Sequence, residues 1–263
     1  MYTIPIHPLL ASGALQFAFD KATPEGKATI IVLFFLSLFS WSIILTKARQ
    51  LYLSRKWAAR FFTAYNATRD PLEVKRGNAT FPAAPAFRLY SSGATELEYQ
   101  LGKATGSAGR ISNSAFDAVK VVLEEAAGAE AMRLEKGMIV LSTAVAGGPF
   151  IGLLGTVWGV METFAGIARA NAATLTAMAP GVAGALIATV VGLLVAIPAM
   201  FAYNFMVTSI RAITQELDGF AARYATQIEH TYVDNRDLED KIVEALQRAS
   251  RIKDADNSLA FRP

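Results

Sequence analysis

Three polar side chains stand out because they lie inside long apolar stretches. Thr156 and Glu162 lie in the run from Gly137 to Ala168, where Glu162 is the only charged residue. Thr189 lies in the uncharged run from Asn171 to Ile210. A carboxylate inside an apolar span is costly and usually faces a cavity or a proton pathway. Two hydroxyls at related depths on antiparallel helices can add to a polar, water-bearing path. These residue types therefore indicate ion or proton passage.

Each of these residues also has a simpler interpretation. Either threonine can bond its own i−4 carbonyl and have no further role. Glu162 can lie near enough to the end of its helix to reach interfacial water. On an α-helix it lies above Gly148 and Gly155, about 120° from the direction of Thr156. We therefore expect Glu162 to point toward a close helix contact rather than straight into a path shared with Thr156.

The apolar runs themselves predict a membrane protein. Hydrophobic residues make up 53% of the 263-residue chain and charged residues 18%. Three windows without charge, or with a single one, are long enough for the roughly 20 residues that a spanning helix needs. The first is not read as a signal peptide, because a positive n-region is missing before it. We expect an all-α integral membrane protein with transmembrane helices at residues 28–46, 137–168 and 177–206.

Basic residues predict how the chain is oriented. Fourteen Lys and Arg lie in residues 47–136 and eight in residues 207–263, whereas the short segment 169–176 has only Arg169. By the positive-inside bias, the two basic regions are cytoplasmic, and residues 1–27 and 169–176 are periplasmic. The net charge of +3 then needs no nucleic-acid partner, because the basic residues flank the lipid bilayer.

Helical patterns continue beyond the predicted spans. The first span continues to Ala67, and Phe87–Leu101 reads as a short helix before a flexible patch at Gly102–Gly109. A helical pattern resumes at Ser112 with no strong breaker before the second span, which predicts one helix of about 50 residues. Asp234–Asp240 is polar, and the last dozen residues look frayed. The third helix is also extended into the cytoplasm, because apolar residues recur at helical spacing at Ile210, Ile213, Leu217, Phe220, Tyr224 and Ile228.

Small residues and prolines in the second and third spans predict close helix packing. Glycine lets helix backbones approach each other, and proline is tolerated where neighbouring helices satisfy the freed carbonyl. Simple packing without further function is the alternative for each of them. The residues are Gly148, Gly152, Gly155, Gly159, Gly181, Pro149 and Pro198.

Several classes of chemistry lack the residues they need. The chain has no cysteine, which excludes disulfides and thiolate metal sites. His7 and His230 are far apart in sequence and lack ligand partners. No phosphate-binding glycine loop followed by Lys and Ser or Thr is present, so the chain is not itself an NTPase. We expect no enzyme activity, no cofactor and no metal.

Two motifs resemble the TolQ/ExbB/MotA family of ion-driven inner-membrane motor proteins, and the TolQ and ExbB branch most closely. One is Ile151–Gly159, with the sequence IGLLGTVWG. The other begins with APGVA at Ala179–Ala183 and ALIAT at Ala185–Thr189, and it continues through AIPA at Ala196–Ala199 into Ala202-Tyr203-Asn204. The resemblance is specific in the second and third spans, whereas Met1–Lys136 matches mainly in layout. The tail after Asn204 is slightly more TolQ-like.

The resemblance implies a bacterial inner-membrane subunit that forms a homopentamer around a dimer of a single-span ExbD- or TolR-like partner. Proton flow would drive one component against the other, and the work would pass to a TonB- or TolA-like periplasm-spanning protein. By analogy, Thr156 and Thr189 would line the pore beside the partner's carboxylate. Lys47 and Arg49 would mark the cytoplasmic end of the first span.

One position departs from the family pattern. The third span of the family usually has Glu within Gly-Ile-Ala-Glu-Ala-Leu, and this chain has Gly184 there. The carboxylate has moved to Glu162, or the partner's acid suffices, or position 184 carries a disabling change. We favour the first hypothesis slightly. A non-conducting scaffold is the alternative function, and a solute permease is weaker because three spans with one acid offer little for a substrate site.

Overall fold

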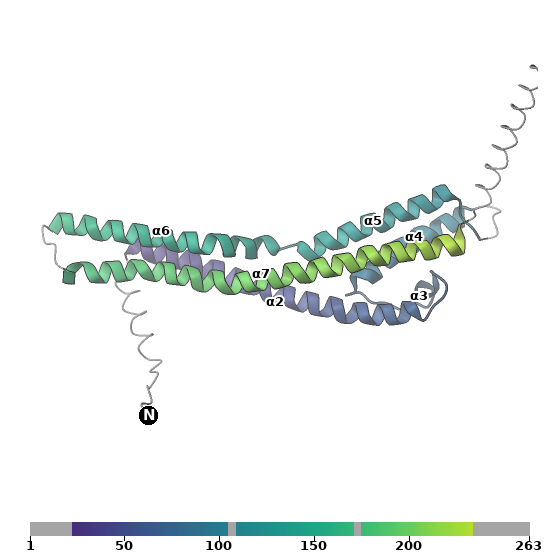
Figure 1. The fold of residues 1–263 in the computed structure, drawn as a ribbon, viewed down its shortest axis with the longest axis horizontal. Helices are drawn as coiled ribbons and strands as arrows, with labels where there is room; N and C mark the ends of the chain where they lie inside the picture. Colours follow the sequence, from purple (N-terminus) through teal and green to yellow (C-terminus); the bar gives the residue numbers. More distant parts are fainter. Residues whose placement is uncertain (1–22, 105–108, 171–174, 234–263) are drawn as a thin grey trace, which may run out of the picture. The chain divides into compact units, whose positions relative to one another are not determined.

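The computed structural model describes residues 23–104, 109–170 and 175–233, and in these ranges the chain is almost entirely α-helical. Three helices are long and apolar enough to cross a membrane. The predicted fold class, an all-α integral membrane protein with three spans, is confirmed. The helices are α2 (Pro24–Asn66), α3 (Glu73–Arg76), α4 (Pro85–Lys103), α5 (Asn113–Glu135), α6 (Met138–Ala170) and α7 (Leu175–Tyr232), shown in Figure 1.

Several sequence predictions can be compared with these bounds. The first span continues as one helix to Asn66, and α4 contains the short helix predicted from Phe87. The third span continues without a break to Tyr232, as predicted. Most of the segment 1–27, the patch at 105–108, the polar residues from Asp234 and the final dozen residues lie outside the described ranges.

The prediction of one helix of about 50 residues leading into the second span is wrong. Helix α5 ends at Glu135 and α6 begins at Met138. Between them Gly137 has φ +89°, a backbone conformation that glycine adopts without the steric cost of a side chain. The α6 ladder starts again with a hydrogen bond from the Val140 N–H to the Gly137 carbonyl, 3.2 Å long. Gly137 is thus a helix terminator, whereas the sequence analysis placed it inside a span.

The chain divides into two compact units. Unit 1 contains residues 1–51 and 135–210, and unit 2 contains residues 52–134 and 211–263. Helices α2 and α7 contribute residues to both units. The three predicted spans belong to unit 1, and the core of unit 2 is built from parts of α2, α4, α5 and α7.

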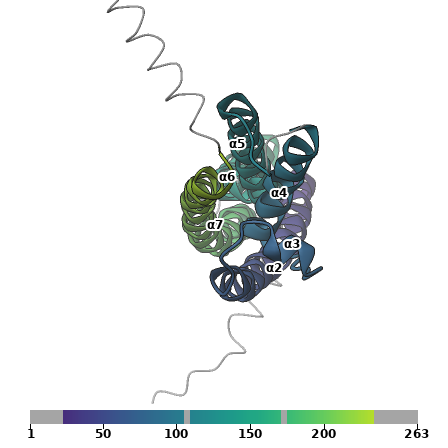
Figure 2. The ribbon, with the colours of Figure 1, turned by 90° about the vertical axis from the view of Figure 1, so that its right-hand side faces the viewer.

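Unit 2 has an aromatic core. Phe61 of α2 is completely buried, and its ring centre lies 5.5 Å from that of Phe220 on α7 and 5.6 Å from that of Tyr90 on α4. The predicted stripe on α7, from Ile213 to Ile228, is buried. Figure 2, which views these helices end-on, shows α2, α4, α5 and α7 around a common centre. Packed aromatic pairs contribute about 0.5–1.5 kcal/mol each beyond the area they bury.

Hydrogen bonds connect this aromatic core to its polar edge. The Tyr224 hydroxyl donates to the carbonyl of Pro71, and the Tyr90 hydroxyl accepts the N–H of Lys75 at 3.0 Å. Burial raises the pKa of Tyr90 to about 12. Between α4 and α5, the Arg88 guanidinium forms a two-point ion pair with the carboxylate of Glu130, whose side chain is only 10% exposed.

Unit 1 has the opposite distribution of side-chain sizes. Many of its large apolar side chains point outward: Phe150 on α6 is 72% exposed, and Phe201 on α7 is 68% exposed. Many of its buried residues are small, such as Ala144, Ala188 and Ala199. Outward-facing apolar side chains over a backbone that is satisfied within its own helix suit a lipid environment.

Candidate functional site

Thr156 of α6 and Thr189 of α7 meet in unit 1. Their hydroxyls form a hydrogen bond to each other, and both also lie within reach of the Gly152 carbonyl, at 3.0 Å from Thr156 and 3.2 Å from Thr189. Each hydroxyl has one proton, so one threonine donates to the carbonyl and the other donates to its neighbouring hydroxyl. Thr156 therefore lies within reach of its own i−4 carbonyl, but this carbonyl forms part of a polar cluster shared by two helices.

Glycines bring these two threonines together. A Cβ on Gly152 would lie 2.8 Å from the Ala188 carbonyl oxygen and 3.0 Å from the Cα of Thr189. Farther along, a Cβ on Gly192 would lie 2.6 Å from the carbonyl oxygen of Gly148. The two backbones therefore touch directly, as small residues at membrane helix contacts allow. This contact fixes the register in which Thr156 faces Thr189.

The same contact continues toward the start of α7. A Cβ on Gly159 would lie 2.7 Å from the Cβ of Ala185, and one on Gly181 would collide with the hydroxyl of Thr163. All the glycines predicted for helix packing thus face closely packed neighbours, including Gly155, described next. The prolines Pro149 and Pro198 lie within helices that continue through them. A packing role for these prolines stays a prediction.

Helix α2 reaches this contact at Gly155. A Cβ on Gly155 would lie 2.6 Å from the Thr29 hydroxyl oxygen of α2 and 2.7 Å from the Ala188 Cβ of α7. Thr29 donates its proton to the Gly26 carbonyl at 2.7 Å. Helices α2, α6 and α7 therefore meet at Gly155 and Ala188. These two residues directly precede Thr156 and Thr189. Thr29 was not predicted as a site residue, because a threonine at the start of an apolar run looks like an ordinary helix-end residue.

Glu162 lies away from the threonine cluster. Its carboxylate pairs with the Arg169 guanidinium at 2.7 Å, and the two side chains are 44% and 70% exposed, respectively. Glu162 follows Thr156 by six residues, or about 9 Å along the helix. It does not point into the helix contact as expected from helix geometry, because its neighbour Thr163 occupies that face against Gly181. A role for Glu162 in ion passage stays a prediction.

Gly184 is buried in α7. It lies one residue before Ala185, which packs against Gly159, and one helical turn before Ala188. The backbone is thus closely surrounded at the position where the resembled family usually has an acid.

Lys47, which the family resemblance places at the end of the first span, is buried, and its burial was not predicted. Lys47 is only 6% exposed, and its ammonium donates to the Gln50 side chain at 3.0 Å. Its Cε lies 3.9 Å from the point where a Cβ on Gly137 would sit, beside Ile43 at 3.6 Å. A lysine next to a helix-ending glycine far along the chain gives no local signal, so only the fold reveals this contact.

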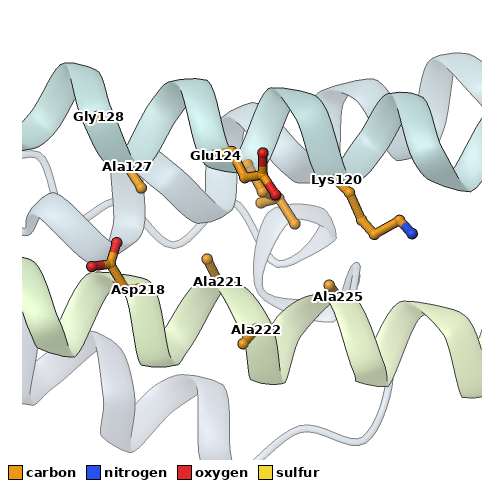
Figure 3. A pocket seen from close by; sticks show the side chains of 9 residues that line it. Lys120, Glu124, Ala127, Gly128, Asp218, Ala221, Ala222 and Ala225 are labelled. Atoms are coloured by element: carbon orange, nitrogen blue, oxygen red, sulfur yellow. The ribbon is translucent and has the colours of Figure 1, made fainter.

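Unit 2 contains a separate groove between α5 and α7, with a volume of about 450 Å³. Figure 3 shows Ala127 and Gly128 on one helix and Ala221, Ala222 and Ala225 on the other, with Lys120, Glu124 and Asp218 beside them. Small side chains create this groove. It contains none of the residues predicted for ion passage.

Together, the fold and the site define a class: an integral membrane protein whose spans pack through glycines around a pair of threonine hydroxyls. Residues 91–219 match the profile of the MotA/TolQ/ExbB proton channel family. The chain is 31% identical over 210 residues to the Tol-Pal system protein TolQ of Haemophilus influenzae, covering 79% of this chain and 90% of that protein. It is 32% identical over 194 residues to the biopolymer transport protein ExbB of Xanthomonas campestris, covering 73% and 77%, respectively.

The chain therefore belongs to the MotA/TolQ/ExbB proton channel family, and the predicted resemblance is confirmed. This is a family of channels and not a class of enzymes. With its three apolar helices, the protein is an inner-membrane protein.

Proposed function

We propose that the chain is the channel subunit of an ion-driven motor of the ExbB–ExbD or TolQ–TolR type. Such a subunit uses the proton-motive force to energise a TonB- or TolA-like protein that spans the periplasm. One observation carries the proposal: two threonine hydroxyls from different spans meet over a shared carbonyl inside unit 1. Polar groups inside spans mark ion and proton pathways. Membership of a proton channel family supports the proton as the transported ion.

Removing the hydroxyls one at a time tests this proposal. Thr156→Val and Thr189→Val keep the β-branched shape and remove the polar group, whereas Thr156→Ser and Thr189→Ser keep the hydroxyl. We expect both valine variants to lose growth or transport that depends on the proton-motive force, and both serine variants to retain most of it. Native mass spectrometry of the purified complex checks assembly. Full activity in both valine variants would contradict the proposal.

A non-conducting scaffold is the second candidate, because the backbone contact along α6 and α7 also suits a purely structural role. The two functions differ in what a correctly assembled valine variant does. A scaffold works normally whenever it assembles, whereas a channel subunit assembles and fails. Assembly and activity must therefore be measured on the same preparations.

The assembly that we propose is a homopentamer around two copies of a single-span ExbD- or TolR-like protein. The support is the family to which the chain belongs. Co-expression with its genomic neighbours followed by native mass spectrometry measures the ratio of subunits directly. A complex without a single-span partner would contradict this part of the proposal.

We also propose that unit 2 lies in the cytoplasm and that the segment 169–176 lies in the periplasm. The support is the excess of basic residues in 47–136 and 207–263. Because the chain has no cysteine, single cysteines report accessibility without background. Tyr99→Cys, at an exposed position of α4, should react with a membrane-impermeant maleimide only after lysis, and Gly166→Cys should react in whole cells with a permeable outer membrane. The reverse pattern would invert the topology.

The relocation hypothesis for the acid missing at position 184 makes its own prediction. If Glu162 supplies that carboxylate, Glu162→Gln stops ion-driven work while assembly survives. The position of Glu162 argues against this role, because its carboxylate pairs with Arg169 and lies away from the threonine cluster. Restored or increased activity in Gly184→Glu would instead identify position 184 as the critical one.

A further inference from the structure

A carboxyl group at the start of α2 has a buried oxygen without a partner. Among the described residues, the Oε2 atom of Glu25 is shielded from solvent and makes no hydrogen bond. The helix does not need Glu25 as a cap, because the Thr23 hydroxyl already accepts the Gly26 N–H at 3.2 Å. Glu25 as a whole is only part-buried, but a shielded carboxyl oxygen without a hydrogen-bond donor is costly unless it takes a proton or a cation. This atom is thus equipped to bind one.

The contacts of Gly155 place Glu25 relative to α7. The Thr29 hydroxyl oxygen and the Ala188 Cβ both lie within 2.7 Å of one point above Gly155, so α2 and α7 meet there. Helix α2 runs antiparallel to α6, because Thr29 lies at Gly155 and Ile43 lies at Gly137. Helix α7 also runs antiparallel to α6, as the Gly148–Gly192 contact shows. At this level α2 and α7 are therefore parallel.

Because α2 and α7 are parallel and meet at Thr29 and Ala188, equal numbers of residues counted from these two positions reach the same depth along the helix axes. One helical turn back from Thr29 is Glu25, and one turn back from Ala188 is Gly184, on the same faces of the two helices. Glu25 and Gly184 thus lie at one level on adjoining faces. Gly184 is buried and contributes no side chain there. The carboxyl comes from α2 at the level where α7 has only a glycine.

The threonine cluster lies one turn farther along. Thr189 follows Ala188 directly and Thr156 follows Gly155, so the hydroxyl pair lies about 6 Å along the helix axes from the level of Glu25. Thr29, on the same face of α2 as Glu25, lies at the level of the hydroxyl pair. The other acid in this part of unit 1, Glu162, has Arg169 as its partner and is 44% exposed.

We propose that Glu25 is the proton-binding carboxyl of the path that contains Thr156 and Thr189. This inference deepens the proposed function and rests on it for the direction of flow. One O–H bond forms when the carboxylate takes a proton, and the same bond breaks when the proton passes on toward the threonine level. No other reactant is consumed. The carboxyl and the two hydroxyls come from three different helices.

Chemical labelling tests the site without requiring transport. Dicyclohexylcarbodiimide reacts with protonated carboxyl groups in apolar surroundings, and mass spectrometry locates the adduct. In membranes containing the full chain and its complex, we expect an adduct on Glu25 that is absent from the Glu25→Gln variant. Glu162, ion-paired and partly exposed, serves as the internal control and should stay unmodified. Labelling of Glu162 with none on Glu25 would overturn the proposal.

Matched variants then connect the carboxyl to work. We expect Glu25→Gln to abolish ion-driven activity with assembly unchanged, and Glu25→Asp to retain activity with a shifted pH profile. Glu162→Gln separates this proposal from the relocation hypothesis, because only the relocation hypothesis requires that variant to lose activity. Normal activity in Glu25→Gln would overturn the proposal. If Glu25 is labelled but the wild-type complex does no ion-driven work, the site stands and the proposed function fails.

Discussion

The two units of this chain solve the same problem, helix association, with opposite sets of side chains. In unit 1, α6 and α7 touch through Gly148, Gly152 and Gly192, and the large apolar residues lie outside. In unit 2, large aromatic residues such as Phe61 and Phe220 fill the inside. Helices in lipid gain little from hiding apolar surface, so close backbone contact drives their association. In water, burial of apolar surface is the main driving force.

The two units should therefore be destabilised by different kinds of substitution. Adding a side chain should harm unit 1 most, and removing one should harm unit 2 most. Single substitutions with a control on the same helix can test both halves of this statement.

The largest effect is expected from Gly152→Leu. Its Cβ alone would lie 2.8 Å from the Ala188 carbonyl oxygen, and a backbone atom of a packed helix cannot move aside cheaply. We expect loss of folded complex, measured as the monodisperse fraction in detergent by size-exclusion chromatography. Gly147→Leu is the control, because nothing lies within 4 Å of a Cβ at Gly147. Equal behaviour of the two variants would show that the backbone contact is unimportant.

Phe220→Ala should cause the next largest effect. The Phe220 ring is buried, and its centre lies 5.1 Å from that of Tyr65 and 5.5 Å from that of Phe61. Truncating a buried Phe costs about 3–5 kcal/mol of unfolding free energy. Thermal unfolding followed by near-ultraviolet circular dichroism should show a clearly lower midpoint. Tyr99→Ala, at a 54% exposed position of α4, should leave the midpoint nearly unchanged.

Glu130→Gln tests the polar link between α4 and α5. The substitution leaves the Arg88 guanidinium, 25% exposed, without its carboxylate. We expect a loss of about 2 kcal/mol in unfolding free energy, less than for a fully buried pair because water reaches Arg88. Glu124→Gln, on the exposed face of the same helix, is the control. If the double variant Arg88→Met, Glu130→Leu is as unstable as Glu130→Gln, loss of charge pairing is not the cause.

The smallest effect is expected from acid acting on Asp70. Burial alone would raise its pKa, but hydrogen bonds from the Leu72 N–H and the Tyr232 hydroxyl, together with the charge of Arg76, lower it overall. A lowered folded-state pKa means that the stabilisation is complete above the unfolded-state value, about 3.9, and is lost as the pH falls through the folded-state value. Asp70→Asn should therefore flatten the acid side of the stability profile. Asp117→Asn, at a 67% exposed side chain, is the matched control for removing one carboxylate.

The sequence was most informative where the pattern is local. Apolar windows located the three spans, and the spacing from Ile213 to Ile228 identified the buried face of α7. The glycines of α6 were recognised as packing residues, because a run of small residues within a span has few other uses.

Predictions failed or were incomplete where the decisive contact is distant in the chain. Gly137 was read as one more glycine of a span, because a glycine with positive φ looks the same in the sequence as a glycine inside a helix. Glu162 was expected to face a helix contact, but Thr163 occupies that face and Arg169 holds the carboxylate. Glu25 was not predicted as a site residue, because an acidic side chain in the first turn of a helix is explained by its favourable interaction with the helix dipole.

The contact between α6 and α7 has a thermodynamic consequence of its own. Glycine and alanine have no side-chain rotamers to lose. The contact therefore restricts almost no side-chain motion, because it joins Gly148, Gly152 and Gly159 of α6 to Ala185, Ala188 and Gly192 of α7. Burying a long side chain costs up to about 2 kcal/mol of conformational entropy, and this interface avoids that cost at nearly every position. Dispersion between the two backbones therefore contributes to association almost undiminished, and rotamer restriction falls mainly on the threonines at its centre.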